Sequence, residues 1–247
     1  MLVKSQVKYI QSLSQKKVRD EEGLFVAEGP KIINDLLDAG NLFLHQLFAT
    51  EAWLQVNGPT VGLIDSRQVI QVNDKEMERL SFLKTPHEVL AVFRKPVFKG
   101  PLKFEGRWTL LLDTIQDPGN LGTIIRSADW FGVDQVVCSV ESADWLNPKV
   151  VQATMGSIAR VRVEYQDLAS ILESNKDVPV YAAVLEGTPL DKMKSGKEGI
   201  LIIGNESKGI HPSLLNSSIN KVTIPRKGGA ESLNAAVATG IFLSHLT

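Results

Sequence analysis

The segment Thr109-Leu110-Leu111-Leu112-Asp113-Thr114-Ile115-Gln116-Asp117-Pro118-Gly119-Asn120-Leu121-Gly122 is the most informative part of this chain for its architecture. Its first four residues are an apolar run of the kind buried in a parallel sheet, and a loop marked by glycine and asparagine follows directly. Two later segments have the same form: 199–203 leads into Gly204-Asn205-Glu206-Ser207-Lys208-Gly209, and 221–224 leads into Pro225 and then Ser232-Leu233-Asn234. Because ligands collect at the carboxyl ends of parallel strands, the three loops predict one composite pocket.

Strands and helices alternate through the rest of the second half of the chain. The expected elements are strands at 109–112, 135–139, 160–163, 180–184, 199–203 and 221–224, and helices at 120–131, after 147–148, 167–173, near Pro212 and 233–246. Such alternation is typical of a parallel sheet. The helix at 120–131 places Leu121, Ile124, Ile125 and Ala128 on one face, and Arg126 points away from that face.

The first half of the chain predicts a small α/β module. Pro30 opens and Gly40 closes an expected helix, further strands are expected at 42–49, 61–64 and 89–93, and a helix is expected at 74–83. Between Phe93 and Trp108, the segment 94–101 combines two prolines, a glycine and three cations, which is typical of a domain boundary. We therefore expect a first domain at 1–95, a linker at 96–107 and a second domain at 108–247.

Composition indicates an ordinary globular protein. The 247 residues are 43% hydrophobic and 22% charged, and nothing resembles a signal peptide or a membrane span, so a cytoplasmic protein without membrane attachment is expected. The only cysteine, Cys138, lies in an apolar run and is interpreted as a core residue, which leaves no cysteine metal cluster.

Charge distribution leaves two interpretations open. The net charge is −1, yet the first 19 residues carry five cations and no acid: Lys4, Lys8, Lys16, Lys17 and Arg19. A second basic stretch runs from Lys84 to Arg107. These stretches are either phosphate-contacting stripes or solvated surface.

Each of the three loops is ambiguous when taken alone. Neither the spacing of a dinucleotide-binding loop nor that of a phosphate-binding loop is present. A structural turn explains Gly119 to Gly122, and helix capping explains Asn205 with Glu206 and Ser232 with Asn234. The joint occurrence of the loops in this order is the informative observation.

The three loops together resemble the signatures of the SpoU (TrmH) family of the SPOUT class. The resemblance rests on Leu-Asp-x-x-x-Asp-Pro-x-Asn-x-Gly-x-x-x-Arg-x-Ala at 112–128, Ile-Gly-Asn-Glu-x-x-Gly at 203–209, and Ile-Pro followed by Glu-Ser-Leu-Asn-x-Ala within 224–238. These enzymes transfer a methyl group from S-adenosylmethionine to a ribose 2′-hydroxyl of RNA. Residues 1–95 also resemble the family's substrate-binding module, through 25–30 and 83–87.

The resemblance implies an α/β fold in which a trefoil-knotted parallel-sheet domain follows a small ribosomal-protein-like domain that binds the RNA substrate. It also implies a homodimer, S-adenosylmethionine as cofactor and no metal. Ribosomal RNA is favoured as substrate because of the extra amino-terminal module, and transfer RNA is the alternative.

The resemblance also assigns site residues. Arg126 takes the place of the arginine that acts on the ribose hydroxyl, with four assisting side chains: Asn120, Glu206, Ser232 and Asn234. The cofactor-binding residues that it implies are Leu185, Glu186, Gly204, Asn205, Gly209, Ile224 and Leu233. Because a guanidinium is a reluctant proton acceptor, we expect Arg126 to stabilise an alkoxide or anchor a phosphate rather than act as a simple base.

The chain departs from the usual pattern at Arg226-Lys227, which either adds a phosphate contact or is surface variation, and at Glu88, where relatives often have glycine. His87 is interpreted as a turn residue. Two other classes of function stay open: a non-catalytic RNA-binding protein that retains the fold, and a nucleotide-binding enzyme, which the missing phosphate-loop signatures disfavour.

Overall fold

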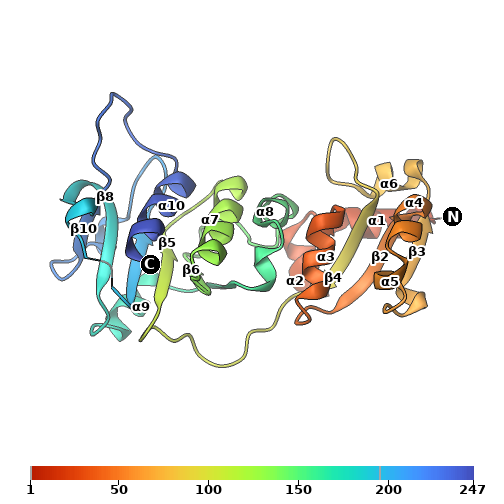
Figure 1. Cartoon of the computed structure of the whole chain (residues 1–247), viewed down its shortest axis with the longest axis horizontal. Coiled ribbons are helices and arrows are strands. Elements are labelled where there is room, and N and C mark those ends of the chain that lie inside the picture. The colour runs from red at the N-terminus through yellow and green to blue at the C-terminus, as the bar shows by residue number, and fades with distance from the viewer. Residues whose placement is uncertain (1, 195) are drawn as a thin grey trace. The chain divides into compact units, whose positions relative to one another are not determined.

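The structure is a computed structural model that describes residues 2–194 and 196–247 (Figure 1). The chain folds into two compact units. Unit 1 contains Met1–Val97 and Leu146–Ala159, and unit 2 contains Phe98–Trp145 and Arg160–Thr247. Residues 146–159 thus pack with the first half of the chain although they lie within the second half of the sequence.

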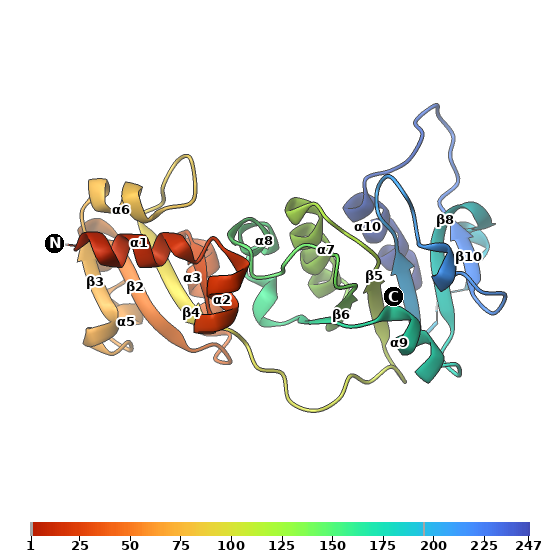
Figure 2. The same cartoon turned by 180° about the vertical axis from the view of Figure 1, so that it is seen from behind.

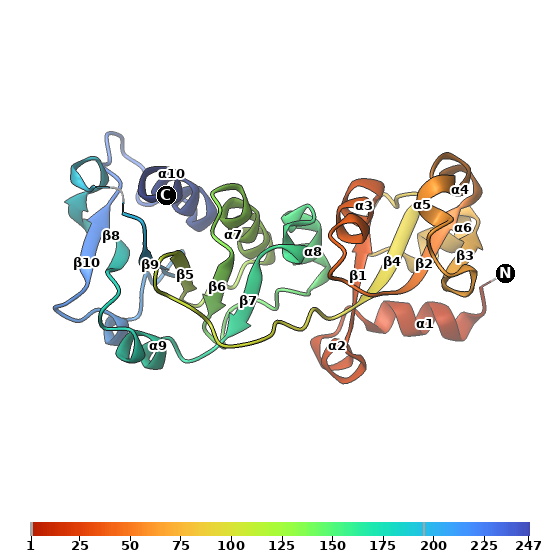
Figure 3. The same cartoon turned by 60° about the horizontal axis from the view of Figure 1, so that its bottom comes forward.

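Unit 2 is built on a six-stranded sheet in which every neighbouring pair is parallel. Its strand order is β10-β8-β9-β5-β6-β7, which can be followed in Figure 3. The strands are β5 (Trp108–Leu112), β6 (Gln135–Cys138), β7 (Arg162–Tyr165), β8 (Val180–Pro189), β9 (Gly199–Ile203) and β10 (Asn220–Thr223). The expected parallel sheet is confirmed.

Helices cover both faces of this sheet. Helices α7 (Pro118–Trp130) and α10 (Ala235–Leu246) pack against each other on one face, and α9 (Leu168–Ser174) covers the other (Figure 3). Short 3₁₀ turns complete the unit: η3 (Leu190–Lys192) and η4 (Pro212–Leu214). The predicted apolar face of α7 is buried, and Arg126 lies exposed on the opposite side, as the periodicity indicates.

Unit 1 contains a four-stranded mixed sheet of order β1-β4-β2-β3. Its strands are β1 (Leu24–Glu28), β2 (Leu44–Thr50), β3 (Val69–Val72) and β4 (Val89–Arg94). Its helices are α1 (Lys4–Ser12), α2 (Lys16–Glu22), α3 (Pro30–Asp38), α4 (Glu51–Val56), α5 (Gly58–Val61), α6 (Asp74–Leu80) and α8 (Pro148–Thr154), with 3₁₀ turns η1 (Ser66–Gln68) and η2 (Ser157–Ala159). Residues of α1 and α6 share a core with the sheet, and α8 packs against β1.

One predicted strand of unit 1 is wrong. Residues 61–64 form the end of α5 and a turn, and Leu63 is almost fully exposed. The third strand is instead β3, whose Val72 is buried. The run Val-Gly-Leu-Ile contains a glycine and has no partner strand beside it, whereas β3 pairs in parallel with β2. The periodicity of four residues could not distinguish these two segments.

Candidate functional site

The three loops predicted to form the site leave the same end of the parallel sheet. They follow β5, β9 and β10, and all strands of the sheet run in the same direction (Figures 1 and 2). β9 pairs directly with β5, and β8 separates β9 from β10. The carboxyl ends of these strands therefore bring segments 113–122, 204–211 and 224–234 to one edge.

A chain of hydrogen bonds joins the three loops through their side chains. The Oδ1 atom of Asn234 accepts from the backbone N–H groups of Ala236 (2.9 Å) and Val237 (3.2 Å) at the start of α10. The Nδ2 atom of Asn234 donates to Oδ1 of Asn120 at 2.8 Å, and Nδ2 of Asn120 donates to Oε1 of Glu206 at 2.6 Å. We call this chain of three side chains the amide relay.

The direction of the amide relay is fixed by the chemistry at its two ends. Backbone N–H groups only donate, so the oxygen of Asn234 must face α10 and its NH₂ group must face Asn120. The oxygen of Asn120 is then used, and its NH₂ group must face the carboxylate of Glu206, which only accepts. Each amide has one productive orientation, and three predicted residues are brought together.

Asn205 holds the loop after β9 by its side chain. Its Oδ1 atom accepts from the backbone N–H groups of Ser207 (2.9 Å) and Lys208 (3.1 Å), and its Nδ2 atom donates to the carbonyl oxygen of Thr114 at 2.8 Å. The backbones of Asn205 and Gly209 also exchange two hydrogen bonds. Asn205 therefore ties the second loop both to itself and to the first loop.

Gly204 is required by the loop itself. A Cβ atom built on Gly204 would lie 2.3 Å from the backbone carbon of Gly209 and from the backbone nitrogen of Ile210. Separations below 3.0 Å force the backbone to shift. The glycine thus permits close packing of the loop on its own start, before any ligand is considered.

The loop after β5 begins with a strained residue that sequence reasoning missed. Thr114 has a φ of 58°, an uncommon value for a β-branched residue. Its backbone N–H donates to Oγ of Ser139 at 2.9 Å, and its hydroxyl donates to Oδ1 of the buried Asp113 at 2.9 Å. Oδ2 of Asp113 accepts from the backbone N–H of His211 at 2.6 Å. A buried aspartate directly after a strand is the signal that identifies this anchor.

Arg126 and Ser232 stand apart from the amide relay. Both side chains are exposed, and neither forms a hydrogen bond or ion pair with another residue within the described part of the chain. Arg126 follows Asn120 by six residues on α7, which corresponds to about 9 Å along the helix axis. Its guanidinium is therefore available to an incoming group.

The expected cofactor wall combines exposed apolar side chains with open backbone. Leu185 is 71% exposed and Leu233 is 45% exposed, while Ile224 is half-buried. Between Ala182 and Thr188 the pairing of β8 with β10 shifts register, so that Leu185 and Glu186 lie in an irregular stretch. The expected end of this strand at 184 is wrong, because β8 continues through these two residues to Pro189. Exposed apolar surface beside irregular backbone fits an adenine ring and its polar edge.

Three of the five basic residues near the amino terminus have partners within unit 1. Lys16 pairs with Asp20 at 2.5 Å and Lys17 pairs with Glu21 at 3.9 Å. Arg19 is only 1% exposed, and its Nη1 atom donates to the carbonyl oxygen of Leu13 at 2.7 Å. Both interpretations are therefore wrong for Arg19, because its charge is buried inside unit 1. For the exposed Lys4 and Lys8 the phosphate-contacting interpretation stays a prediction.

Cys138 lies fully inside the sheet of unit 2, as expected for a core residue. Burial raises the pKa of its thiol far above the ordinary value, so the group is inert as a nucleophile. Among residues 2–194 and 196–247, no group of three or more His, Cys, Asp or Glu side chains is placed to hold a metal ion. Within the same residues no helix combines the length and the apolar character that crossing a membrane requires.

Comparisons with known proteins identify the family of the chain. Residues 107–244 match the family model of the SpoU rRNA Methylase family, and residues 4–91 match the MRM3-like substrate binding domain. The chain is 32% identical over 243 residues to the 23S rRNA (guanosine(2553)-2′-O)-methyltransferase RlmP of Bacillus subtilis, covering 97% of this chain and 95% of that protein.

Two solved structures are similar over the whole chain. A putative RNA methyltransferase of the TrmH family from Porphyromonas gingivalis has a TM-score of 0.86 and 38% identity, covering 100% of this chain and 98% of that one. The AdoMet-bound rRNA methyltransferase of Sinorhizobium meliloti has a TM-score of 0.85 and 33% identity, covering 100% and 95%. The expected fold class, an α/β protein with a parallel-sheet SPOUT domain, is confirmed, as are the enzyme class, RNA methyltransferase, and the cofactor, S-adenosylmethionine. The chain belongs to the SpoU rRNA methylase family.

Proposed function

We propose that the protein transfers a methyl group from S-adenosylmethionine to a ribose 2′-hydroxyl of ribosomal RNA. The amide relay is the observation that carries this proposal, because it assembles side chains of all three signature loops at one sheet edge. The relative from B. subtilis, named for a 23S rRNA target, supports ribosomal RNA over the alternative, transfer RNA.

Arg126 is proposed to act on the ribose. An arginine side chain stays charged at every physiological pH, so it stabilises a developing alkoxide or anchors the neighbouring phosphate better than it removes a proton. Its exposure and its lack of a partner among the described residues leave the guanidinium able to do so. Asn120, Glu206 and Asn234 hold the loops, and Ser232 lies next to the relay in sequence, where it can reach the substrate.

The cofactor is proposed to lie against the loops after β8, β9 and β10. When bound, S-adenosylmethionine supplies a methyl group on a sulfonium, which is an excellent leaving group, so that alignment is the main task of the protein. Leu185, Ile224 and Leu233 offer the apolar surface for the adenine. Polar backbone is offered by the remaining residues of the predicted set: Glu186, Gly204, Asn205 and Gly209.

A homodimer with a knotted carboxyl-terminal domain is part of the proposal. Val237 and Ile241, which are 52% and 36% exposed, lie one turn apart on α10 and share one face of that helix. Trp130, at the end of the neighbouring α7, is 84% exposed. Apolar side chains of this size on packed helices favour coverage by a second copy. We also propose the functional division into 1–95, 96–107 and 108–247, and a cytoplasmic location.

The Arg126→Ala variant tests the catalytic assignment. We expect unchanged affinity for S-adenosylmethionine in calorimetry and about a 100-fold loss of methyl transfer to ribosomal RNA, because one electrostatic partner of the reacting oxygen is removed. Arg126→Lys is the matched control, since it keeps the charge and loses the planar fork. Full turnover by Arg126→Ala would refute the assignment.

Substrate identity has its own test. A deletion strain is compared with its parent by mapping 2′-O-methyl marks in ribosomal and transfer RNA. Loss of one mark in ribosomal RNA is expected. Loss in transfer RNA would select the alternative substrate, and a wild-type protein that binds RNA but neither binds S-adenosylmethionine nor labels RNA would select a non-catalytic RNA-binding protein.

A further inference from the structure

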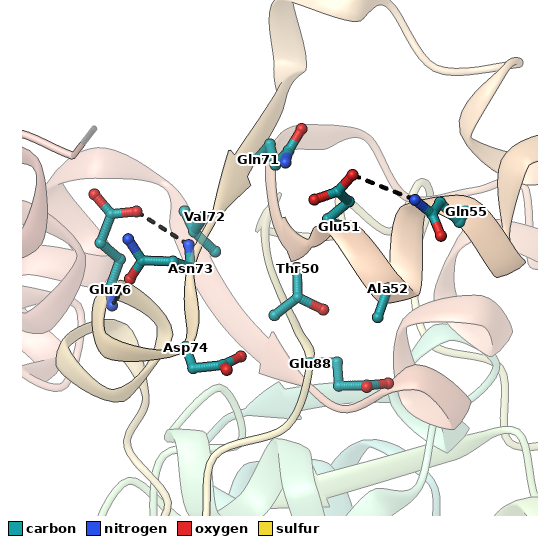
Figure 4. A pocket seen from close by; sticks show the side chains of 10 residues that line it. All are labelled: Thr50, Glu51, Ala52, Gln55, Gln71, Val72, Asn73, Asp74, Glu76 and Glu88. Atoms are coloured by element: carbon teal, nitrogen blue, oxygen red, sulfur yellow. Dashed lines mark hydrogen bonds between the residues drawn. The ribbon is translucent and has the colours of Figure 1, made fainter.

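The end of the unit 1 sheet where β1, β2 and β3 finish carries opposite charges on its two sides. β1 lies at one edge of the sheet and β3 at the other. On the β2–β3 side an open cleft of about 880 Å³ is lined by ten residues, of which four are acidic and none is basic: Glu51, Asp74, Glu76 and Glu88 (Figure 4). Such a cleft repels phosphate groups.

The β1 side of the same sheet end carries the loop 81–87, which presents one lysine. Glu28, the last residue of β1, is buried, and its carboxylate accepts from the hydroxyl of Ser81 at 2.5 Å and from the backbone N–H of Phe82 at 2.8 Å. The Ser81 hydroxyl oxygen accepts in turn from the backbone N–H of Leu83 at 3.0 Å. Lys84, the next residue, is exposed. The buried carboxylate thereby fixes the start of the loop that presents this lysine.

His87 ends the loop on the surface of Gly29. Gly29 has a φ of 96°, and a Cβ atom built there would lie 3.0 Å from Cδ2 of His87. The glycine gives the exposed imidazole a flat backbone surface to lie on. The loop from Ser81 to His87 is thus held at both ends by residues of the β1 terminus.

Helix α8 adds a second lysine beside this loop. Leu83, next to Lys84, lines a small cavity of about 30 Å³ together with Lys149 and Gln152 of α8 and with Glu28. Lys149 is exposed, and neither lysine side chain forms a hydrogen bond or ion pair with another residue in the part of unit 1 that the structure describes. Lys149 therefore lies across this cavity from Leu83, the residue that precedes Lys84, although the two lysines are far apart in sequence.

We propose that Lys84 and Lys149 form a composite phosphate-contacting surface for the RNA substrate, with the acidic cleft excluding the RNA backbone from the β2–β3 side. The inference rests on the proposed function and names the part of unit 1 that meets the RNA. Charge complementarity favours RNA as the partner: the two ammonium groups lack partners among the described residues, whereas the lysines of α2 are paired with Asp20 and Glu21. His87 lies at the end of the same loop, where a ring can contact a base or ribose.

The double variant Lys84→Ala/Lys149→Ala tests this surface on the full-length protein with in-vitro transcribed 23S ribosomal RNA. We expect affinity to fall about tenfold at physiological salt, and the slope of log affinity against log salt to become shallower by about 1.5, as two phosphate contacts are lost. KM for RNA should rise with kcat unchanged. Calorimetry with S-adenosylmethionine and the unfolding midpoint should match the wild type.

Lys16→Ala/Lys17→Ala is the matched control, because it removes the same net charge from lysines that are already paired. It should leave RNA affinity and salt slope near the wild-type values. An equal loss in this control, or wild-type affinity and slope in the Lys84→Ala/Lys149→Ala variant, would overturn the composite surface. A wild-type protein that labels no RNA would instead overturn the proposed function, so the two failures are distinguishable.

Discussion

Replacing Asn120 by aspartate changes one NH₂ group of the amide relay into an oxygen and alters little else. The backbone N–H of Asn120 is capped by Asp117 and does not depend on its own side chain. In the variant, two carboxylates would face each other where Nδ2 of Asn120 now lies 2.6 Å from Oε1 of Glu206. The bond from Asn234 to the other oxygen can persist.

The expected cost has two parts. Losing a hydrogen bond to a charged group costs about 1.5–3 kcal/mol. Two unit charges about 3 Å apart repel by about 5 kcal/mol at an effective dielectric of 20, but both side chains are only partly buried, so we expect about 1–2 kcal/mol of that repulsion. The sum of about 2.5–5 kcal/mol corresponds to a loss of roughly 70- to 5000-fold. Asn120→Ala, which breaks both bonds without repulsion, should lose about 30-fold.

The assay is kcat/KM for methyl transfer to ribosomal RNA, measured between pH 5 and pH 8 for the wild type and both variants. Facing carboxylates favour uptake of a shared proton, and a protonated side chain can donate to its neighbour. Asn120→Asp should therefore recover toward the level of Asn120→Ala, or above it, as the pH is lowered. Asn120→Ala should show the pH profile of the wild type.

Equal activities of Asn120→Asp and Asn120→Ala at pH 8 would contradict this account, because the relay would then carry no charge-dependent contact. So would an Asn120→Asp variant whose deficit is independent of pH. Unfolding midpoints of the two variants serve as the check that lost activity reflects the loops and not the whole of unit 2.

Three further outcomes are expected. Gly204→Ala should lower the unfolding midpoint by several degrees and abolish S-adenosylmethionine affinity, since its Cβ would meet backbone at 2.3 Å, whereas Gly228→Ala, with nothing within 4 Å, should be neutral in calorimetry. The Cys138 thiol should react with a disulfide reagent only at the rate of unfolding, because burial raises its pKa. Hydrogen bonds from Lys16 and Lys95 lower the pKa of Asp20 to about 2. The contribution of Asp20 to the free energy of unfolding, at most about 1 kcal/mol for an exposed pair, should therefore be present above pH 4 and disappear as the pH falls toward 2. A stability gap between wild type and Asp20→Asn that persists at pH 2 in urea titrations would contradict this.

The second unit was predictable because its strands are uninterrupted apolar runs that a parallel sheet buries on both faces. Leu110 and Leu201 are fully buried, and the loops after their strands could be placed at one edge from direction alone. That Asn120, Glu206 and Asn234 touch also followed from shared position, once the resemblance had singled them out. The donor and acceptor direction of their hydrogen bonds did not follow, because it depends on which backbone N–H groups at the start of α10 donate to Asn234.

Other features have no signal in a single sequence. Close backbone approach makes Gly204 indispensable, and the atoms involved come from the end of the same loop. In the sequence Arg19 cannot be distinguished from a surface cation, because only the structure shows that its guanidinium donates to the carbonyl oxygen of Leu13. In the sequence α8 lies between strands β6 and β7 of unit 2, yet its contacts with β1 place it in unit 1. Each of these outcomes is set by tertiary packing, which overrides local pattern.

Thr114 gives the loop after β5 a store of strain that matters for engineering. A left-handed threonine stores on the order of 1–3 kcal/mol, which its bonds to Asp113, Ser139 and Asn205 hold in place. A search for heat-tolerant variants would therefore find Thr114→Gly attractive, because glycine adopts the left-handed backbone without the steric cost of a Cβ atom, and this gain is offset only in part by its greater freedom in the unfolded chain. Such a variant would gain thermal stability and lose the rigidity of the loop after β5. Selection for stability and selection for turnover would therefore favour different residues at this position.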